Sequence, residues 1–320
     1  MVSPYNIEEI FPEAAREPVR LPRQQSGRSP QGLAVTLVTD YTLRSRGWLP
    51  SAAIVALLAE FGISAANARA AISRLARRGV LESDRQRPGS SYRLTESAAQ
   101  NLSAGGRQIA TFAAEAESWD GWWTLIAFSL PKQATAERRL LRGQLRWCGY
   151  APLYDGLWIA PHQLDDASRA KLAKLALGAI TVFRAQHVEV NAITGRAPID
   201  AWDTGAIARA YQSFIASWRD LLPRVRAGRV TGAAAVRART GVMDTYRRFP
   251  TLDPRLPIRL MPPGWPRADA HALFVAIYDG LAAPAQEHVR AIAARYATGS
   301  QPGVRAHTIA EFEPGPGRPA

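Results

Sequence analysis

The apolar positions between residues 50 and 78 recur with the spacing of two short helices separated by a tight turn. Gly62 in this turn can adopt the left-handed conformation that ends a helix. The hydroxyl of Ser64 can then accept a hydrogen bond from a free backbone N–H and cap the next helix. That helix has an apolar face opposite a face of small and basic residues; the apolar positions are Ala68, Ala71, Ile72 and Leu75. The pattern predicts a helix–turn–helix whose second helix covers residues 65–78.

Two short runs of strand-forming residues, 80–82 and 92–94, come directly after this helix. The nine residues between the runs include a Pro-Gly turn signal and are too many for a tight hairpin. Two strands joined by a basic loop, after a helix–turn–helix, are typical of a winged helix. We therefore predict a winged helix-turn-helix domain at residues 31–95, a type of fold that usually binds duplex DNA.

The exposed face of the second helix carries side chains that suit bases and phosphates. Arg can bond bidentately to guanine and Asn to adenine, and either can hold a phosphate. Residues 31–95 contain nine arginines against four acidic residues, although a solvated arginine face without a ligand is the alternative interpretation. The predicted DNA-binding residues are Asn67, Arg69, Ser73, Arg74, Arg77 and Arg78 in the helix, with Arg85 and Arg87 at the tip of the wing.

The charge of the whole chain favours a polyanionic partner without identifying it. The 320 residues carry a formal net charge of +13, which an acidic membrane surface or an anionic small molecule would also suit. Cys148 is the single cysteine, so an internal disulfide framework is excluded and a reducing compartment is favoured. No apolar run reaches the length of a membrane span and the N-terminus lacks the apolar core of a secretory signal. We therefore expect a cytoplasmic protein with no membrane partner.

A second domain is predicted at residues 119–197, where strand-like and helical patterns alternate. The run 123–130 is short and apolar, and Asp155-Gly156 is a strong hairpin signal between two further apolar runs. Helical patterns at 135–147 and 166–177 and a strand-like pattern at 180–190 complete the order β-α-β-β-α-β. This order predicts a ferredoxin-like domain.

The rest of the chain is predicted to be helical or flexible. Residues 198–297 show helical apolar stripes around a proline-rich loop and predict a helical C-terminal domain, which makes the fold class α+β. An alanine-rich stretch at 96–118 predicts a connecting helix that is interrupted around Gly105-Gly106. The polar residues 1–30 and the Gly/Pro-rich residues 298–320 predict a flexible arm and a flexible tail.

The order of these motifs resembles the PaaX-type transcriptional regulators, a repressor family first associated with phenylacetic acid catabolism. The resemblance covers about residues 30–297. It is carried by FGISAANARAAISRLARRGVLE at 61–82, SSYRLT at 90–95, WDGWWTLIAFSLP at 119–131, LLRGQLRWCGYAPLYDGLWIAP at 140–161 and YRRFPTLDPRLPIRLMPPGWPRADAHALFVAIYDGL at 246–281.

The resemblance implies a homodimeric repressor that binds a pseudo-palindromic duplex DNA operator. It implies an N-terminal winged helix, a ferredoxin-like middle domain similar to the CRISPR-associated Cas2 proteins, and a helical C-terminal domain. An aryl-CoA thioester, typically phenylacetyl-CoA, is the implied small-molecule effector that releases the repressor. No cofactor is expected. In the family pattern Asn67, Arg69, Ser73 and Arg74 correspond to recognition-helix residues.

The phosphates of such an effector would need basic side chains. The candidates are Arg138, Arg139, Arg142 and Arg146 on the predicted helix 135–147; the sets Arg224, Arg226 and Arg229, and Arg247 and Arg248, are alternatives. Five tryptophans lie in the middle domain, where core packing competes with an aryl pocket as the interpretation.

The sequence leaves two enzymatic alternatives to a regulator. Cas2-like strands commonly end in an acidic residue, but this chain has Ser129 there, which cannot replace a carboxylate as a metal ligand and weakens a metal-dependent nuclease. The five histidines are scattered without metal-binding spacing. A CoA-dependent enzyme with a DNA-binding module lacks a visible nucleophile–base pair. We therefore expect a protein that is not an enzyme.

Overall fold

A computed structural model describes residues 29–84, 90–113, 119–166, 169–170, 172, 179–188, 196–297 and 303–312. The chain forms two compact units, which are described separately. Of the described residues, the first unit combines those up to 113 with 213–249 and those from 268 onward. The second unit combines the described residues within 119–212 with residues 250–267. The predicted helical domain at 198–297 is therefore divided between the two units, because its segments pack with different partners.

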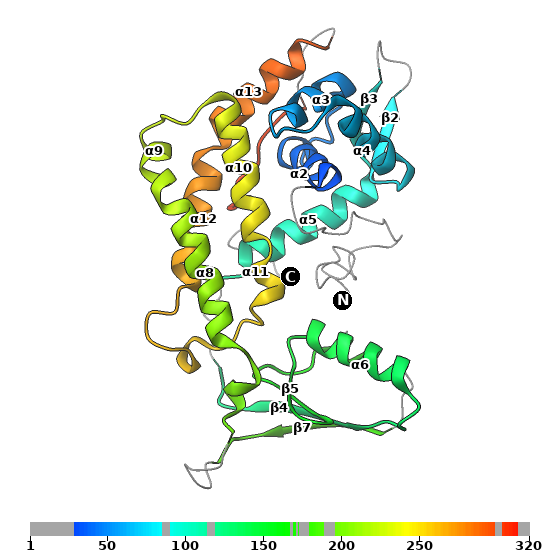
Figure 1. Cartoon of the computed structure of the whole chain (residues 1–320), viewed down its shortest axis with the longest axis vertical. Helices are drawn as coiled ribbons and strands as arrows, with labels where there is room; N and C mark the ends of the chain where they lie inside the picture. Colours follow the sequence, from blue (N-terminus) through cyan, green and yellow to red (C-terminus); the bar gives the residue numbers. More distant parts are fainter. Residues whose placement is uncertain are drawn as a thin grey trace. The chain divides into compact units, whose positions relative to one another are not determined.

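The first unit begins with an N-terminal module, residues 29–94, of three helices and a small sheet (Figure 1). Its helices are α2 (Pro30–Thr42), α3 (Ser51–Ala59) and α4 (Ala65–Arg77). Its strands β1 (Leu49–Pro50), β2 (Leu81–Asp84) and β3 (Ser91–Leu94) form an antiparallel sheet in the order β1-β3-β2. The helix and strand positions agree with those predicted for residues 50–95.

Helices from the C-terminal half of the first unit pack against this module. The helix α10 (Gly232–Tyr246) packs on α13 (Ala282–Ala294); α10 also contacts α2, and α13 contacts α3. The helix α12 (Arg267–Gly280) contributes the buried Phe274, Ile277 and Tyr278. Further helical elements between residues 204 and 252 are α8 (Thr204–Trp218), η2 (Arg219–Leu221), α9 (Leu222–Arg226) and α11 (Phe249–Leu252).

The helix α5 (Glu96–Thr111) leaves the module and runs without a break through Gly105 and Gly106. The predicted interruption at these glycines is therefore wrong. The glycine serves packing instead, because a Cβ at Gly106 would lie only 2.6 Å from the ring of Phe312. A hydrogen side chain at this position lets the aromatic ring lie directly on the helix.

Residues 303–312, called the C-terminal segment below, are packed rather than free. Val304, His307, Ile309 and Phe312 are all buried. This differs from the prediction of a flexible tail over 298–320, which rested on the glycines and prolines that flank the segment. The apolar side chains within the segment outweigh that composition.

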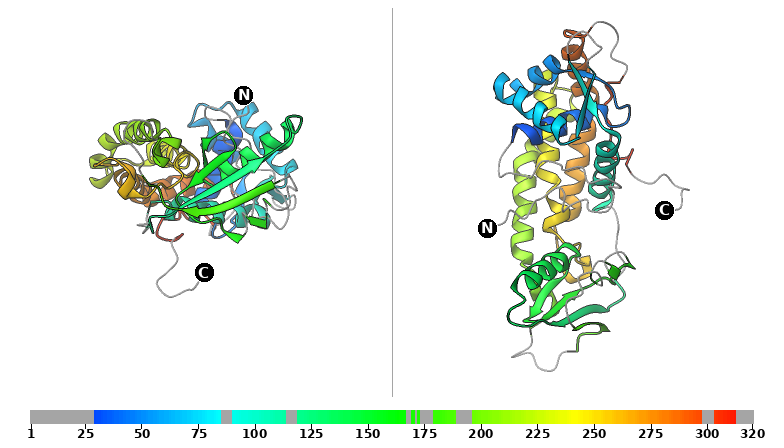
Figure 2. Two further views of the ribbon diagram at one scale, coloured as in Figure 1. Left: turned by 90° about the horizontal axis from the view of Figure 1, so that it is seen from below. Right: turned by 90° about the vertical axis from the view of Figure 1, so that its right-hand side faces the viewer.

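The second unit is built on a four-stranded antiparallel sheet, seen from below in Figure 2 (left). Its strands are β4 (Trp123–Ser129), β5 (Ala151–Tyr154), β6 (Leu157–Ala160) and β7 (Ala179–Ala185), in the order β5-β6-β4-β7. This is the strand order of a β-α-β-β-α-β ferredoxin-like arrangement. Most of the predicted helix 166–177 lies outside the described residues.

One face of this sheet is covered by α6 (Thr135–Trp147). Its core includes Ile126, Leu141, Leu145 and Trp158. On the opposite face, Trp123 packs at one end against Trp119, Trp202 and Leu260, beside the short helices η1 (Pro198–Ala201) and η3 (Ile258–Leu260). Among the described helices, none has the length and apolar character needed to cross a bilayer.

Candidate functional site

The best-formed candidate site is the surface of α4 in the N-terminal module. Gly62 has a φ of 79°, which ends α3 and turns the chain into α4. The side chain of Ser64 accepts a hydrogen bond from the backbone N–H of Asn67 at 3.3 Å and so caps α4. Ala68, Ala71 and Leu75 are fully buried and fix the rotation of the helix on the module. The opposite side of the helix is therefore held toward solvent.

Five of the six residues predicted on this helix are exposed on it. These are Asn67, Arg69, Ser73, Arg77 and Arg78. Arg69, Arg77 and Arg78 form no ion pair within the described part of the chain, so their guanidinium groups are available to a ligand. Arg74 is half-buried, and its Nε is enclosed without a hydrogen-bond partner among the described residues. Arg85 and Arg87, predicted at the tip of the wing, lie outside the described residues.

The structure also separates free arginines from paired ones near α4. The carboxylate of Glu82 binds Arg93 Nε at 2.6 Å and Arg46 Nη2 at 2.8 Å. The guanidinium of Arg93 also lies over the ring of Trp48, with Cζ 4.4 Å from its centroid. Both arginines are paired with a residue of the small sheet. Less unpaired positive charge is therefore available to a ligand than the nine arginines of residues 31–95 implied. The register that places Arg93 opposite Glu82 was the signal that sequence reasoning did not use.

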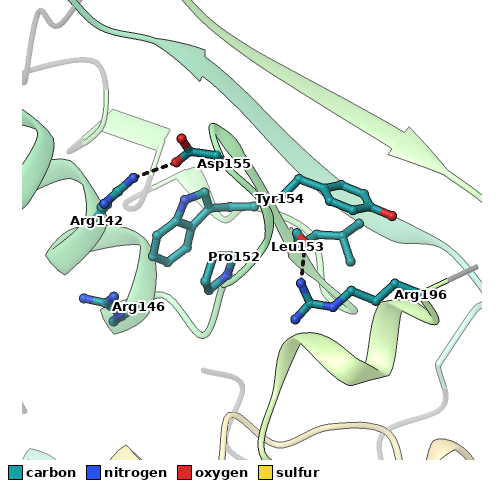
Figure 3. A pocket seen from close by; sticks show the side chains of 8 residues that line it. Arg142, Arg146, Pro152, Leu153, Tyr154, Asp155 and Arg196 are labelled. Carbon is teal, nitrogen blue, oxygen red and sulfur yellow. Dashed lines mark hydrogen bonds and ion pairs between the residues drawn. The ribbon is translucent and has the colours of Figure 1, made fainter. Parts of the chain in front are cut away.

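A second candidate site is a cavity of about 350 Å³ in the second unit (Figure 3). It lies between the last turns of α6 and the β5–β6 hairpin, beside Arg196. Its lining combines three arginines with apolar surface: Arg142, Arg146, Pro152, Leu153, Tyr154, Asp155, Trp158 and Arg196. Such a site suits an anion that carries an apolar group.

Each arginine of this cavity is held differently. Arg142 Nη2 pairs with Asp155 Oδ1 at 3.0 Å, and the Cζ of Arg146 lies 5.5 Å from the ring centroid of Trp158. Arg196 donates to the carbonyl of Leu153 at 2.7 Å and to that of Asp200 at 2.9 Å. Arg196 was missed in the sequence, because only the folded hairpin brings it beside α6.

The four arginines predicted for an effector therefore divide into two pairs. Arg142 and Arg146 line the cavity, whereas Arg138 and Arg139 do not. Arg138 instead donates to the carbonyls of Leu130 and Pro131 at the end of β4, and Arg139 is exposed. Residues 138, 142 and 146 lie one turn apart along one side of α6, whereas Arg139 lies on another side. Arg138 falls outside the cavity because its position in the first turn of α6 places it beside the end of β4.

Other groups considered for chemistry have structural partners. His162 Nε2 lies 2.8 Å from the carbonyl oxygen of Cys148, and Cys148 is half-buried. Ser129, at the position where Cas2-like strands commonly carry an acidic residue, is exposed at the end of β4. In the portion of the chain that the structure covers, no three His, Cys, Asp or Glu side chains gather in a way that could hold a metal ion.

Three family models match the chain in succession. Residues 29–98 match "PaaX-like protein", residues 116–195 match "PaaX protein central Cas2-like domain", and residues 202–291 match "PaaX-like protein C-terminal domain". The first match contains α4 with all of its exposed arginines. The second contains the four-stranded sheet, α6 and most of the cavity residues.

Two individual proteins are similar over most of the chain. Transcriptional repressor PaaX of Escherichia coli (strain K12) is 29% identical over 241 residues, which cover 73% of this chain and 74% of the relative. A solved structure, uncharacterized protein Rv0674 from Mycobacterium tuberculosis, superposes with a TM-score of 0.51 at 20% identity, covering 80% of this chain and 96% of the other. At that identity the second likeness concerns the fold alone.

Proposed function

The chain belongs to the PaaX family, and we propose that it is a dimeric transcriptional repressor that binds a palindromic DNA operator and is released by an aryl-CoA thioester. The relative named as a transcriptional repressor supports the repressor function and favours a protein without catalytic activity. Because regulation of this kind takes place at the DNA, a cytoplasmic location is part of the proposal. The three finer parts of the proposal, operator, dimer and effector, have separate supports.

The observation that carries operator binding is the exposed face of α4. In this proposal the N-terminal module is a winged helix-turn-helix and α4 is its recognition helix, which enters the major groove. Asn67 and Arg69 lie in the first turns of α4, where base contacts of such helices concentrate, and Ser73 and Arg77 follow along the exposed side. Their donors suit base edges and phosphates, and no described carboxylate neutralises Arg69 or Arg77.

The dimer is supported by the uncovered end of one sheet face in the second unit. Leu125, Ala127 and Phe183 share the face opposite α6, by the register of β4 and β7. The Phe183 side chain on this face is 52% exposed. An antiparallel sheet that faces water usually carries polar side chains on that side, but this face has no charged residue on β4 or β7. A face without charge can pack on a second copy of itself about a two-fold axis.

The effector is supported by the cavity between α6 and the β5–β6 hairpin. Arg142, Arg146 and Arg196 surround it against the single acidic side chain of Asp155. Phosphate groups of a CoA moiety would meet the guanidinium groups, and the apolar lining at Pro152 and Trp158 would contact an aryl group or the base. The two enzymatic alternatives have no comparable support among the described residues.

For the operator, we expect Arg69→Ala to weaken binding by about ten- to hundredfold, the loss of one good base or phosphate contact. A duplex selected by the wild-type chain from a random pool serves as the operator, and affinity is measured by fluorescence anisotropy at several salt concentrations. The matched control is Arg237→Ala, which removes the same charge from an exposed position of α10 and should change affinity by less than about threefold. Equal affinities for both variants would contradict the role of α4.

For the dimer, we expect Phe183→Asp to convert the dimer to a monomer, because a carboxylate would be buried without a partner in the interface. Sedimentation velocity gives the oligomeric state directly. Tyr296→Asp is the control, since Tyr296 is an exposed aromatic residue of the first unit, and this variant should remain dimeric. A Phe183→Asp protein that stays dimeric would show that the sheet face is not the interface.

For the effector, we expect phenylacetyl-CoA to raise the melting temperature of the wild-type chain in a concentration-dependent way and to displace the operator. Arg146→Ala should weaken this response about tenfold or more, whereas Arg139→Ala, on the same helix but away from the cavity, should retain it. The same response in both variants would exclude the cavity as the effector site.

A further inference from the structure

Four buried polar side chains meet inside the first unit, where the N-terminal module packs on the helices. They are Asp40 of α2, Arg239 of α10, Tyr278 of α12 and His307 of the C-terminal segment. We call these four residues the polar cluster. Arg239 is completely buried, which is rare for a guanidinium group because its loss of hydration must be offset.

Tyr278 lies at the centre of the polar cluster. Its hydroxyl donates to Asp40 Oδ1 at 2.7 Å and lies 3.0 Å from His307 Nε2. The guanidinium of Arg239 lies over the Tyr278 ring, with Cζ 3.6 Å from the centroid, and 5.8 Å from the centroid of Tyr41. Arg239 also donates to the backbone carbonyl of His307. The hydroxyl of Tyr278 therefore connects α12 to α2 and to the C-terminal segment. The guanidinium of Arg239 connects α10 to the same group.

The charges in the polar cluster depend on one another. Burial, with the nearby Arg239 and Arg44, lowers the pKa of His307 to about 3, so its ring is neutral. Nε2 of this neutral ring can donate to the Tyr278 hydroxyl oxygen. The pKa of Asp40 is raised, because the effect of burial outweighs Arg239, the Tyr278 hydroxyl and Arg247, which act to lower it. The positive charge of Arg239 is thus the main electrostatic partner of the Asp40 carboxylate.

The C-terminal segment bonds to both sides of the junction. The amide of Arg305 donates to the carbonyl of Tyr41 in α2 at 2.8 Å. Facing the helices, the amide of Ala306 donates to Gln286 Oε1 at 2.8 Å and the amide of Ile309 to Asp279 Oδ1 at 2.9 Å. The segment therefore ties the module to α12 and α13 through backbone groups.

Two direct contacts reinforce the same junction. His288 Nε2 of α13 lies 2.6 Å from Glu60 Oε1, at the end of α3. Arg247 Nη1, after α10, lies 3.3 Å from Thr36 Oγ1 of α2. The helices α2 and α3, against which α4 packs in the module, are thus bonded to α13 and to the end of α10.

We propose that the polar cluster and the C-terminal segment position the recognition helix on the helical part of the first unit, and thereby fix the half-site spacing that the repressor accepts. The inference rests on the proposed function, because it presupposes a dimer that binds two half-sites. In such a dimer the distance between the two α4 helices is set by every rigid junction between them. A junction that could rotate would let the dimer reach several spacings at an entropic cost.

The polar cluster is only partly satisfied, so a small change is expected to release it. Asp40 Oδ2, His307 Nδ1, and Arg239 Nε and Nη1 are buried without hydrogen-bond partners among the described residues. Removing the Tyr278 hydroxyl leaves Asp40 Oδ1 and His307 Nε2 unpaired as well. Water can restore these bonds only when α2 separates from the helices. Tyr278→Phe therefore favours a looser junction without touching the DNA-binding face.

The test uses the selected operator with its half-sites moved apart or together by one, two and five base pairs. Dissociation constants are measured for the wild-type chain, Tyr278→Phe and a chain that ends at residue 302 and lacks the C-terminal segment. A duplex with a single half-site reports the intrinsic affinity of α4. Circular dichroism confirms the fold of each protein, and Tyr278→Phe provides the answer if the shortened chain does not fold.

The wild-type affinity should fall about tenfold or more when the spacing changes by one or two base pairs, since each base pair rotates and translates the half-site. In Tyr278→Phe this preference should shrink to within about threefold, with the single half-site bound within about twofold of wild type. Tyr211→Phe is the matched control: it removes a buried Tyr–Asp hydrogen bond, 2.8 Å to Asp253 in the second unit, and should retain the wild-type spacing profile.

An unchanged spacing profile in Tyr278→Phe would overturn the inference, as would an equal loss of affinity at every spacing and at the single half-site. Either result would still be compatible with the proposal that α4 binds the operator. A wild-type chain that selects no duplex would instead overturn the proposed function, and the inference with it.

Discussion

The buried guanidinium of Arg239 is the constraint around which the first unit is organised. A full positive charge with no solvent exposure is tolerated only where aromatic rings and an opposite charge surround it. Here α2 supplies Tyr41 and Asp40, α12 supplies Tyr278, and the C-terminal segment supplies a carbonyl. Removing any of these elements would take away part of what compensates the charge. The N-terminal module is therefore part of a larger unit and is not an independent domain joined to the rest by a flexible linker.

This organisation links the interior of the first unit to the chemistry on its surface. The apolar side of α4 is seated on the module, and the module is seated on α10 and α13 through α2 and α3. The exposed arginines of α4 therefore lie on a helix whose position depends, through α2, on the polar cluster. In a repressor, such a support makes the geometry of the dimer a determinant of specificity alongside the base contacts. The uncovered sheet face and the arginine-lined cavity of the second unit give that unit different proposed tasks, assembly and effector binding.

Local patterns predicted much of this architecture. Gly62 and Ser64 mark the turn into α4, and Asp155-Gly156 marks the β5–β6 hairpin, because both signals act over a few residues. The polar cluster could not be predicted, since its four side chains come from segments that only the tertiary fold brings together. The packing of the C-terminal segment was not predicted, because the glycines and prolines around it indicated a flexible tail. The bounds of α4 were predicted correctly, but the pairing of Arg93 with Glu82 and the position of Arg196 in the same cavity lining as α6 required the fold.

Native-state hydrogen exchange tests most directly whether the module, the helices and the C-terminal segment form one cooperative unit. The informative amides are those of Arg305, Ala306 and Ile309, which are hydrogen-bonded across the junction. If the polar cluster holds the unit together, these amides exchange with the same opening free energy as the core amides of α10 and α2. Exchange of the three amides orders of magnitude faster than α10, with α2 opening separately from the helices, would contradict the account.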